Sequence, residues 1–197
     1  MATPLGAHSD RLKEVRALRS VKGRHERGRF AFEGPTLLAE AFASSFPIEA
    51  LYVTQAAYAA TPLVRELDSG GTPTFTIDSA SAARISDLTT PTGIVAVACA
   101  RLSTPEEIFA ANAPIVVLAD IGDPANAGTL LRSAEAFGCA GAICGSLGVE
   151  PYHPKVVRGS MGAVFRLRIA IGEPAAVAGA ASAAGVRLVG LDVRGEP

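Results

Sequence analysis

The feature that most constrains the fold is the stretch 115–138, which reads IVVLADIGDPANAGTLLRSAEAFG. Its first four residues are branched and apolar, as in a strand that is buried on both faces of a parallel sheet. A turn follows at residues 122–126, and apolar residues then recur at helical spacing. The side chains predicted to face the core from this helix are Leu130, Leu131, Ala134 and Phe137. This order places the turn at the carboxyl edge of a sheet, where open α/β folds bind ligands.

Two polar residues stand out in this apolar stretch, Asn126 and Arg132. Asn126 is a favoured residue type for the N-cap of the predicted helix, and Gly138 is typical of a helix C-terminus. An arginine within a mostly apolar helix is costly unless an anionic group meets it. Taken singly, Asn126 is better explained as a cap and Arg132 as half of an ion pair.

A wider pattern changes that balance. The stretch resembles the first signature motif of the SpoU-type (TrmH-like) branch of the SPOUT RNA methyltransferases, through Asp120, Asp123-Pro124, Asn126-x-Gly128 and Arg132. A second block, residues 154–163 (PKVVRGSMGA), is similar to the Lys-x-x-Arg-x-Ser-x-Gly-Ala run that follows in that family. Two blocks in the family's order make the resemblance specific.

The resemblance implies an α/β fold with two parts. A small N-terminal α/β RNA-binding domain precedes the first part of a SPOUT-type parallel-sheet domain, whose chain forms a trefoil knot in the family. It implies S-adenosylmethionine-dependent 2′-O-methylation of a ribose in RNA, with ribosomal RNA expected before transfer RNA. Asn126 and Arg132 are then the expected catalytic residues, and Asn126 with Gly128 the expected contacts to the cofactor.

Methylating a ribose 2′-hydroxyl requires that the oxygen be aligned with the methyl donor, lose its proton and be stabilised as charge develops. Arginine stays protonated, with a pKa above ~12, so Arg132 is a poor free base. We expect it to hold a phosphate and stabilise the alkoxide, with base catalysis as the alternative. Asn126 would orient the ribose or Arg132.

Charge is distributed unevenly along the chain. The net charge is −1, yet residues 11–29 contain eight basic and two acidic residues. This asymmetry indicates a polyanionic partner, here RNA, although a solvated basic surface is the alternative. The residues predicted to bind RNA are Arg16, Arg19, Arg24, Arg27 and Arg29, together with Lys155 and Arg158 in the second block.

The chain is predicted to divide into an RNA-binding domain (1–100), a linker (101–114) and a methyltransferase domain (115–197). Apolar periodicity predicts strands and helices in alternation through the first domain. Residues 22–29 are predicted to form a basic loop, and residues 165–171 and 186–193 two strands of the second domain.

The resemblance weakens toward the C-terminus. In the family, a glycine-rich Leu-Gly-Asn-Glu-type loop and a Ser-x-Asn-Val-type segment build most of the donor pocket, and neither occurs before Pro197. We therefore expect the main pocket to be missing, as in a fragment or an inactive relative, and S-adenosylmethionine to bind weakly. The family's homodimer, formed through the knot region, is in doubt for this chain. The alternatives are a non-catalytic RNA-binding module and, more distantly, a small-molecule α/β enzyme.

Three cysteines, Cys99, Cys139 and Cys144, form no Cys-x-x-Cys pair, which favours a reducing compartment over a disulfide framework or a zinc site. Cys139 is expected to be a small buried residue. No apolar run reaches the ~18 residues of a membrane-spanning helix. These observations predict a cytoplasmic protein without membrane or metal partners.

Overall fold

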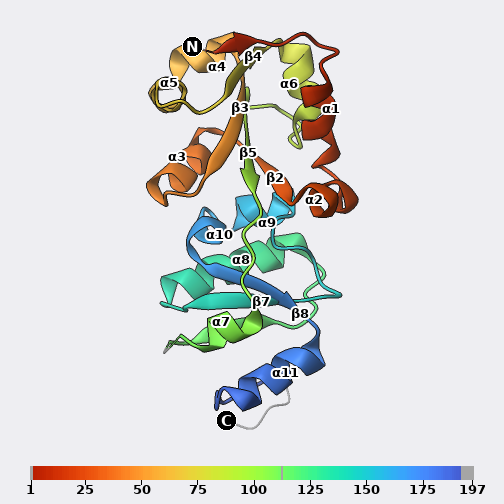
Figure 1. The fold of residues 1–197 in the computed structure, drawn as a ribbon, viewed down its shortest axis with the longest axis vertical. Helices are drawn as coiled ribbons and strands as arrows, with labels where there is room; N and C mark the ends of the chain where they lie inside the picture. Colours follow the sequence, from red (N-terminus) through yellow and green to blue (C-terminus); the bar gives the residue numbers. More distant parts are fainter. Residues whose placement is uncertain (1, 112, 192–197) are drawn as a thin grey trace.

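The computed structural model describes residues 2–111 and 113–191, which form two α/β domains stacked end to end (Figure 1). A five-stranded sheet in the order β1-β4-β3-β5-β2 forms the first domain, and a three-stranded sheet in the order β6-β7-β8 forms the second. The helices α8, α9 and α10 lie between the two sheets, whereas α7 and α11 lie beyond the second sheet (Figure 1).

The strands of the first sheet are β1 (Thr3–Pro4), β2 (Arg29–Glu33), β3 (Ile48–Thr54), β4 (Thr74–Ile77) and β5 (Ile94–Cys99). The helices of the first domain are α1 (Asp10–Ala17), α2 (Val21–Arg27), α3 (Pro35–Ala43), α4 (Gln55–Ala60), α5 (Pro62–Ser69) and α6 (Ser79–Ile85). The second domain contains β6 (Ile115–Leu118), β7 (Gly141–Gly145), β8 (Arg168–Gly172), α7 (Pro105–Phe109), α8 (Pro124–Ala136), α9 (Pro154–Gly159), α10 (Ala163–Arg166) and α11 (Pro174–Ala183).

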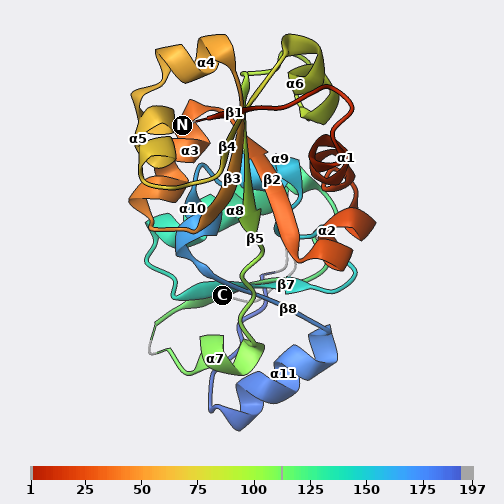
Figure 2. The ribbon, with the colours of Figure 1, turned by 45° about the horizontal axis from the view of Figure 1, so that its top comes forward.

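Strand β5 is buried on both faces because it lies inside the first sheet, antiparallel to both β3 and β2. Ile94, Ala96 and Ala98 face a core that is closed by α3, α4 and α5, whereas Val95 and Val97 face the core under α1 and α6. Figure 2 shows the two helix layers on opposite sides of the sheet. The continuous apolar sequence of β5 follows from this double burial.

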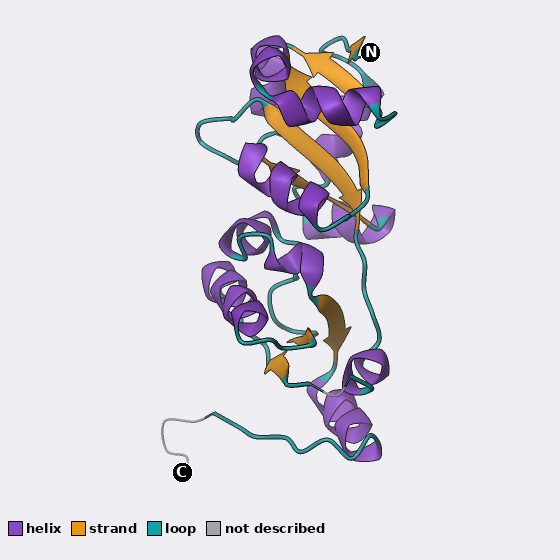
Figure 3. Cartoon of the chain, turned by 90° about the vertical axis from the view of Figure 1, so that its left-hand side faces the viewer, coloured by secondary structure: helices purple, strands orange, loops and turns teal. Residues whose placement is uncertain are grey.

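The second sheet is entirely parallel and is also covered on both faces. Helix α8 packs Ala127 and Leu131 against one face, and α7 and α11 pack Phe109 and Val177 against the other. Figure 3 shows these helices on either side of the short strands. Parallel strands joined by helices bring all their carboxyl ends to one edge, where the chain after β6 and β7 forms turns.

The two domains share one hydrophobic core. The rings of Phe30 on β2 and Tyr152 stack with centroids 4.4 Å apart, and Phe32 lies 5.0 Å from Phe165 of α10. The hydroxyl of Tyr152 donates a hydrogen bond of 2.5 Å to the carbonyl of Arg101, directly after β5. Burial raises the pKa of this hydroxyl to about 12. The domains are therefore joined by tight packing as well as by the connecting chain.

Most of the predicted elements are present, but three predictions of secondary structure are wrong. Residues 22–29, predicted as a loop, lie mostly in α2, because Ser20 caps this helix through the backbone N–H of Gly23 and Gly28 ends it in a left-handed conformation. Residues 165–171, predicted as one strand, are divided between α10 and β8. Residues 186–191 form no strand, and the rest of the segment predicted there, 192–193, lies outside the described residues.

Helix α8 also differs from its prediction. Leu131 and Ala134 are buried as expected, but Phe137 is 84% exposed and Leu130 is 38% exposed. Gly138 follows the C-cap Phe137 with a φ of 73°, which fits the expected glycine at the end of the helix. In the described residues, no helix is long and apolar enough to cross a membrane.

Candidate functional site

Helix α8 begins at the carboxyl edge of the second sheet, and its first turn carries Asn126. The N-cap is Asp123, whose carboxylate accepts a 2.8 Å hydrogen bond from the backbone N–H of Asn126. The prediction of Asn126 as the cap is therefore wrong, because Asp123 and Pro124 already begin the helix. The exposed side chain of Asn126 makes no hydrogen bond within the described chain, so its amide is available to a ligand.

Arg132 lies in the same helix and is also exposed. Among the described residues, no carboxylate pairs with it, so it is neither a structural ion pair nor a buried charge. Ideal helix geometry places Arg132 about 9 Å from Asn126 along the axis and about 120° around it. The two side chains therefore face different directions, and each must contact a different group of any shared ligand.

Gly128 has a packing role in the structure. A Cβ atom at this position would lie 2.9 Å from the Cα of Gly159 and 2.9 Å from the carbonyl oxygen of Val156. The glycines of the two motif blocks thus allow α8 and α9 to touch through their backbones. The expected contact of Gly128 with the cofactor stays a prediction, and this helix contact is sufficient to explain the glycine.

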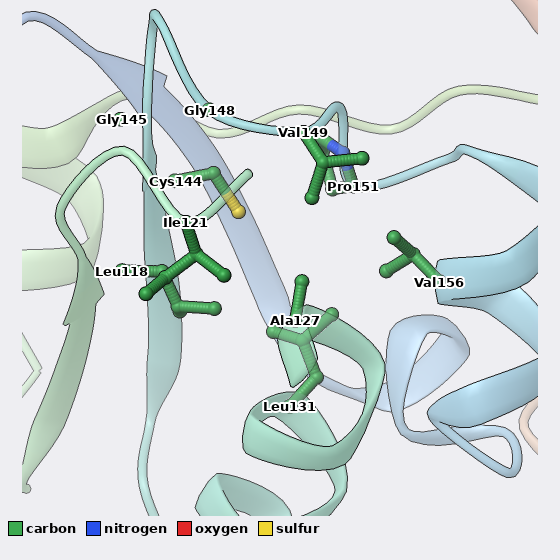
Figure 4. A pocket seen from close by; sticks show the side chains of 10 residues that line it. All are labelled: Leu118, Ile121, Ala127, Leu131, Cys144, Gly145, Gly148, Val149, Pro151 and Val156. Atoms are coloured by element: carbon green, nitrogen blue, oxygen red, sulfur yellow. The ribbon is translucent and has the colours of Figure 1, made fainter. Parts of the chain in front are cut away.

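A small pocket lies where β6 and β7 meet α8 at this edge, and Figure 4 shows the side chains that line it. Leu118, Ala127, Cys144 and Val156 make it apolar, and its open volume is about 10 Å³. Competent small-molecule sites measure about 300–1,000 Å³. S-adenosylmethionine does not fit this pocket, so we assign none of the donor's contacts to the residues around it.

The loops beside this pocket are held by hydrogen bonds to one another. Asp120 adopts a φ of 51°, and its carboxylate accepts a 3.1 Å hydrogen bond from the N–H of Leu147. The N–H of Val149 donates to the carbonyl of Ile121 at 2.8 Å. The turn that precedes Asn126 is therefore tied to the loop that follows β7.

The second motif block joins the two domains. Arg158 of α9 donates a 3.0 Å hydrogen bond to the carboxylate of Asp87 in the first domain. Glu33 holds that segment, since its carboxylate accepts hydrogen bonds from the Ser86 hydroxyl and the Asp87 backbone. Arg158 is thus engaged by protein rather than free for phosphate. Lys155 is exposed and, among the described residues, has no acidic partner.

Arg24, predicted to bind RNA, is only 3% exposed. Its guanidinium forms hydrogen bonds of 2.7–3.0 Å with both carboxylate oxygens of Glu150 and donates to the Leu18 carbonyl at 2.8 Å. His153 lies nearby and caps α9 through Nδ1, which accepts from the Lys155 N–H. Burial and the charge of Arg24 lower the pKa of His153. Arg24 therefore faces the domain interface, where no phosphate reaches it in this arrangement.

The other predicted RNA-binding arginines are exposed at several places on the first domain. Arg16 makes no ion pair among the described residues, and Arg19 donates weakly to the Arg84 carbonyl at 3.5 Å. Arg29 pairs with Glu49 at 2.5 Å, while Arg27 makes only longer contacts with Glu26 and Gly23. The basic segment therefore does not form one uniform RNA surface.

Sequence reasoning missed the acidic partners of Arg24, Arg158 and Arg166. Glu150, Asp87, Glu40 and Glu135 each bind an arginine from a distant part of the chain. Arg166 alone binds two of them, at 2.5 Å in the case of Glu40. Gly162 sits against Glu40 with a φ of 93°, so the glycine of the second block leaves room for this pair. No local pattern in the sequence marks these carboxylates.

The titratable groups suggest no further chemistry at this edge. In the described residues, no group of three His, Cys, Asp or Glu side chains is arranged to hold a metal ion. The three cysteines are free thiols; Cys144 is buried, which raises its pKa to about 11. Cys139, expected to be buried, is partly exposed.

Comparison with protein families gives two matches that follow one another along the chain. Residues 9–96 match the MRM3-like substrate binding domain, and residues 113–197 match the SpoU rRNA Methylase family. The mitochondrial rRNA methyltransferase 3 of Mus musculus is 30% identical over 159 residues, which cover 74% of this chain and 36% of the mouse protein. This chain therefore spans little more than a third of that relative.

Further relatives and solved structures agree with these matches. A 23S rRNA guanosine 2′-O-methyltransferase of Bacillus subtilis is 24% identical over 163 residues, which cover 83% of this chain and 62% of the relative. The crystal structure of an AdoMet-bound rRNA methyltransferase from Sinorhizobium meliloti superposes with a TM-score of 0.79 at 25% identity, and the match covers 93% of this chain and 69% of that one.

Proposed function

Because the chain joins an MRM3-like substrate-binding domain to a domain of the SpoU rRNA methylase family, we propose that it belongs to an enzyme that methylates ribosomal RNA at a ribose 2′-oxygen. The relative from Bacillus subtilis, which is named for 2′-O-methylation, supports the choice of atom. The AdoMet-bound relative from Sinorhizobium meliloti supports S-adenosylmethionine as the methyl donor.

The observation that carries this proposal is that two polar side chains on α8 are available to a ligand. Asn126 and Arg132 are exposed and unpaired within the described chain, whereas Arg158 is used to hold the domains together. A free amide at the carboxyl edge of a parallel sheet, with a free arginine further along the same helix, is suited to an anionic ligand. An RNA strand offers such groups in its phosphates.

The roles of these side chains follow from their chemistry. The Arg132 guanidinium stays protonated, so we assign it to a phosphate next to the target ribose and to the negative charge that develops on the 2′-oxygen. The Asn126 amide can donate and accept, which suits a ribose hydroxyl. Because the two residues point in different directions, Asn126 positions the ribose while Arg132 acts on the neighbouring charge.

This assignment is tested in any form of the protein that transfers methyl groups. Arg132→Ala should slow single-turnover transfer at saturating RNA by at least ~100-fold, the scale of losing one electrostatic stabiliser. The fold should remain intact, because Arg132 has no partner among the described residues. Arg168→Ala, another exposed arginine of the same domain, is the matched control. Transfer by Arg132→Ala within tenfold of the parent would contradict the role.

The second candidate is a non-catalytic RNA-binding module, which the small pocket at Leu118 and Ala127 favours. Calorimetric titration of the 197-residue chain with S-adenosylmethionine can exclude the module. We expect no saturable binding in the micromolar range, because the described pocket does not hold the ligand. Micromolar binding at one site per chain would show that the donor pocket lies elsewhere in these residues and would exclude the module.

A further inference from the structure

A wide groove lies on the first domain. It is bounded by α1, by the end of α2 and by one face of β3 and β5, and its open volume is about 470 Å³. Figure 2 shows α1 and α2 beside strand β2 on this side of the sheet. The volume falls within the range of sites that hold small molecules or single nucleotides.

The groove exists because helices cover only part of this face of the sheet. Helices α1 and α6 close the core around Tyr52 and Val95, while the floor beside them is formed by Ala50 and Val97. Because the side chain of Ala50 is short, the groove is deeper at this point. Val15 of α1 forms an apolar wall. Ala50 is 9% exposed and Val97 is 6% exposed, so the apolar floor is narrow and a nucleobase can meet it along only part of its face.

The rim of the groove is charged, and its arginines differ in availability. Arg29 is neutralised by Glu49, whose other carboxylate oxygen accepts a 2.8 Å hydrogen bond from the Cys99 thiol. Arg27 is exposed and, among the residues that the structure describes, has only a 3.7 Å contact with Glu26 and a 3.4 Å contact with the Gly23 carbonyl. Arg27 is therefore free to bind a phosphate at the mouth of the groove.

Arg11 lies at the side of the groove, over an aromatic ring. Its guanidinium lies 4.8 Å from the centre of the Phe75 ring, and Phe75 in turn stacks on Tyr52 with ring centres 5.3 Å apart. A guanidinium that is stacked on one face presents its other face and its edge for contact. Unpaired RNA bases bind by stacking on aromatic rings and arginine planes of this kind.

We propose that this groove binds one unpaired nucleotide of the RNA substrate, with its base on the Ala50–Val97 floor beside Arg11 and its phosphate at Arg27. This inference rests on the proposed function, which supplies RNA as the ligand. A base within a duplex cannot enter the groove, because its faces are covered by its neighbours. The exposed carboxylate of Glu14 on the rim can accept hydrogen bonds from the amino groups of the base.

The test uses the full 197-residue chain and two labelled RNAs in fluorescence anisotropy: a hairpin with an unpaired loop and a blunt duplex of the same length. Ala50→Leu fills the floor without changing the charge and should weaken hairpin binding about tenfold, the scale of losing one stacked base, while duplex binding stays unchanged. Val97→Ile adds a single methyl group to the same floor and should weaken hairpin binding less. Ala56→Leu, at an exposed position of α4, is the matched control and should bind like the parent.

The charged rim is tested in the same assay. Arg27→Ala should weaken hairpin binding and reduce the slope of log affinity against log salt by roughly one contact, whereas Arg65→Ala on α5 should not. Hairpin binding by both folded floor variants at the parent's affinity would overturn the nucleotide site. Equal losses for hairpin and duplex would also overturn it. If the parent binds neither RNA, the proposed function itself fails, a result distinct from failure of the groove alone.

Discussion

The domain interface and the solvent-facing helix surfaces use the same residue type in opposite ways. At the interface, Arg24, Arg158 and Arg166 each meet a carboxylate from the other domain. On the outer surfaces, Arg16 of α1 and Arg132 of α8 meet none among the described residues. An arginine in a basic segment or a motif can thus hold two domains together or remain available to a ligand. Which of the two it does depends on whether a carboxylate lies within reach.

The interface arginines and the exposed arginines should also differ in how much they contribute to stability. Arg24 is withdrawn from water, so its charge depends on Glu150 and on the Leu18 carbonyl. Removing one partner of a buried pair leaves an uncompensated charge, whereas removing an exposed arginine costs little. The interface arginines should therefore control stability, and the exposed arginines should control binding to RNA. Three substitutions test this division.

The largest effect is expected from Arg24→Ala, which strands the largely buried carboxylate of Glu150. It should lower the free energy of unfolding by about 3–5 kcal/mol, measured by urea denaturation. The double substitution Arg24→Met with Glu150→Met should recover much of this loss, because no buried charge remains. A loss below about 1 kcal/mol for Arg24→Ala would mean that the pair is not buried in solution.

Arg158→Ala should have an intermediate effect. The side chains of Arg158 and Asp87 are each about 30% exposed, so the substitution should lower the free energy of unfolding by about 1 kcal/mol. The slope of log affinity against log salt for RNA should stay unchanged, because Arg158 contacts protein. A smaller slope, with stability unchanged, would move Arg158 to the RNA-binding group and would contradict the assignment made from the structure.

The smallest effect on stability is expected from Arg16→Ala, which removes an exposed side chain that has no partner in the described residues. Unfolding should change by less than about 0.5 kcal/mol. If this face of α1 touches RNA, the salt slope should fall by about one unit. An unchanged slope would exclude Arg16 from the RNA contact and leave the groove arginines to account for the basic segment.

The sequence predicted the fold well where apolar periodicity was strong. Strand β5 and the end of α8 follow directly from their residues. Helix α2 was missed because Lys22, Gly23 and Arg24 have no apolar repeat, and this helix is fixed by its caps and by the burial of Arg24. The segment 165–171 alternates like a strand, yet Phe165 lies in α10 because it fills the aromatic cluster between the domains.

From the sequence, the candidate site could be predicted only as a list of residues in the motif, without the partners of their side chains. Asn126 and Arg132 were predicted from their resemblance to the family's motif, and the structure adds that both are exposed and unpaired among the described residues. The partners that remove Arg24 and Arg158 from the RNA surface, Glu150 and Asp87, lie 126 and 71 positions away. Pairings of this range depend on how the domains pack, and no local pattern encodes them.

The shared aromatic core has a consequence for the order in which the protein can form. Phe30 and Phe32 leave the ribosome early, but Tyr152 and Phe165, which cover them, are made more than a hundred residues later. Translation proceeds at about 5–20 residues per second, so these rings wait roughly 6–27 seconds for their partners. During synthesis the first domain therefore carries an uncovered aromatic surface until Tyr152 and Phe165 are made.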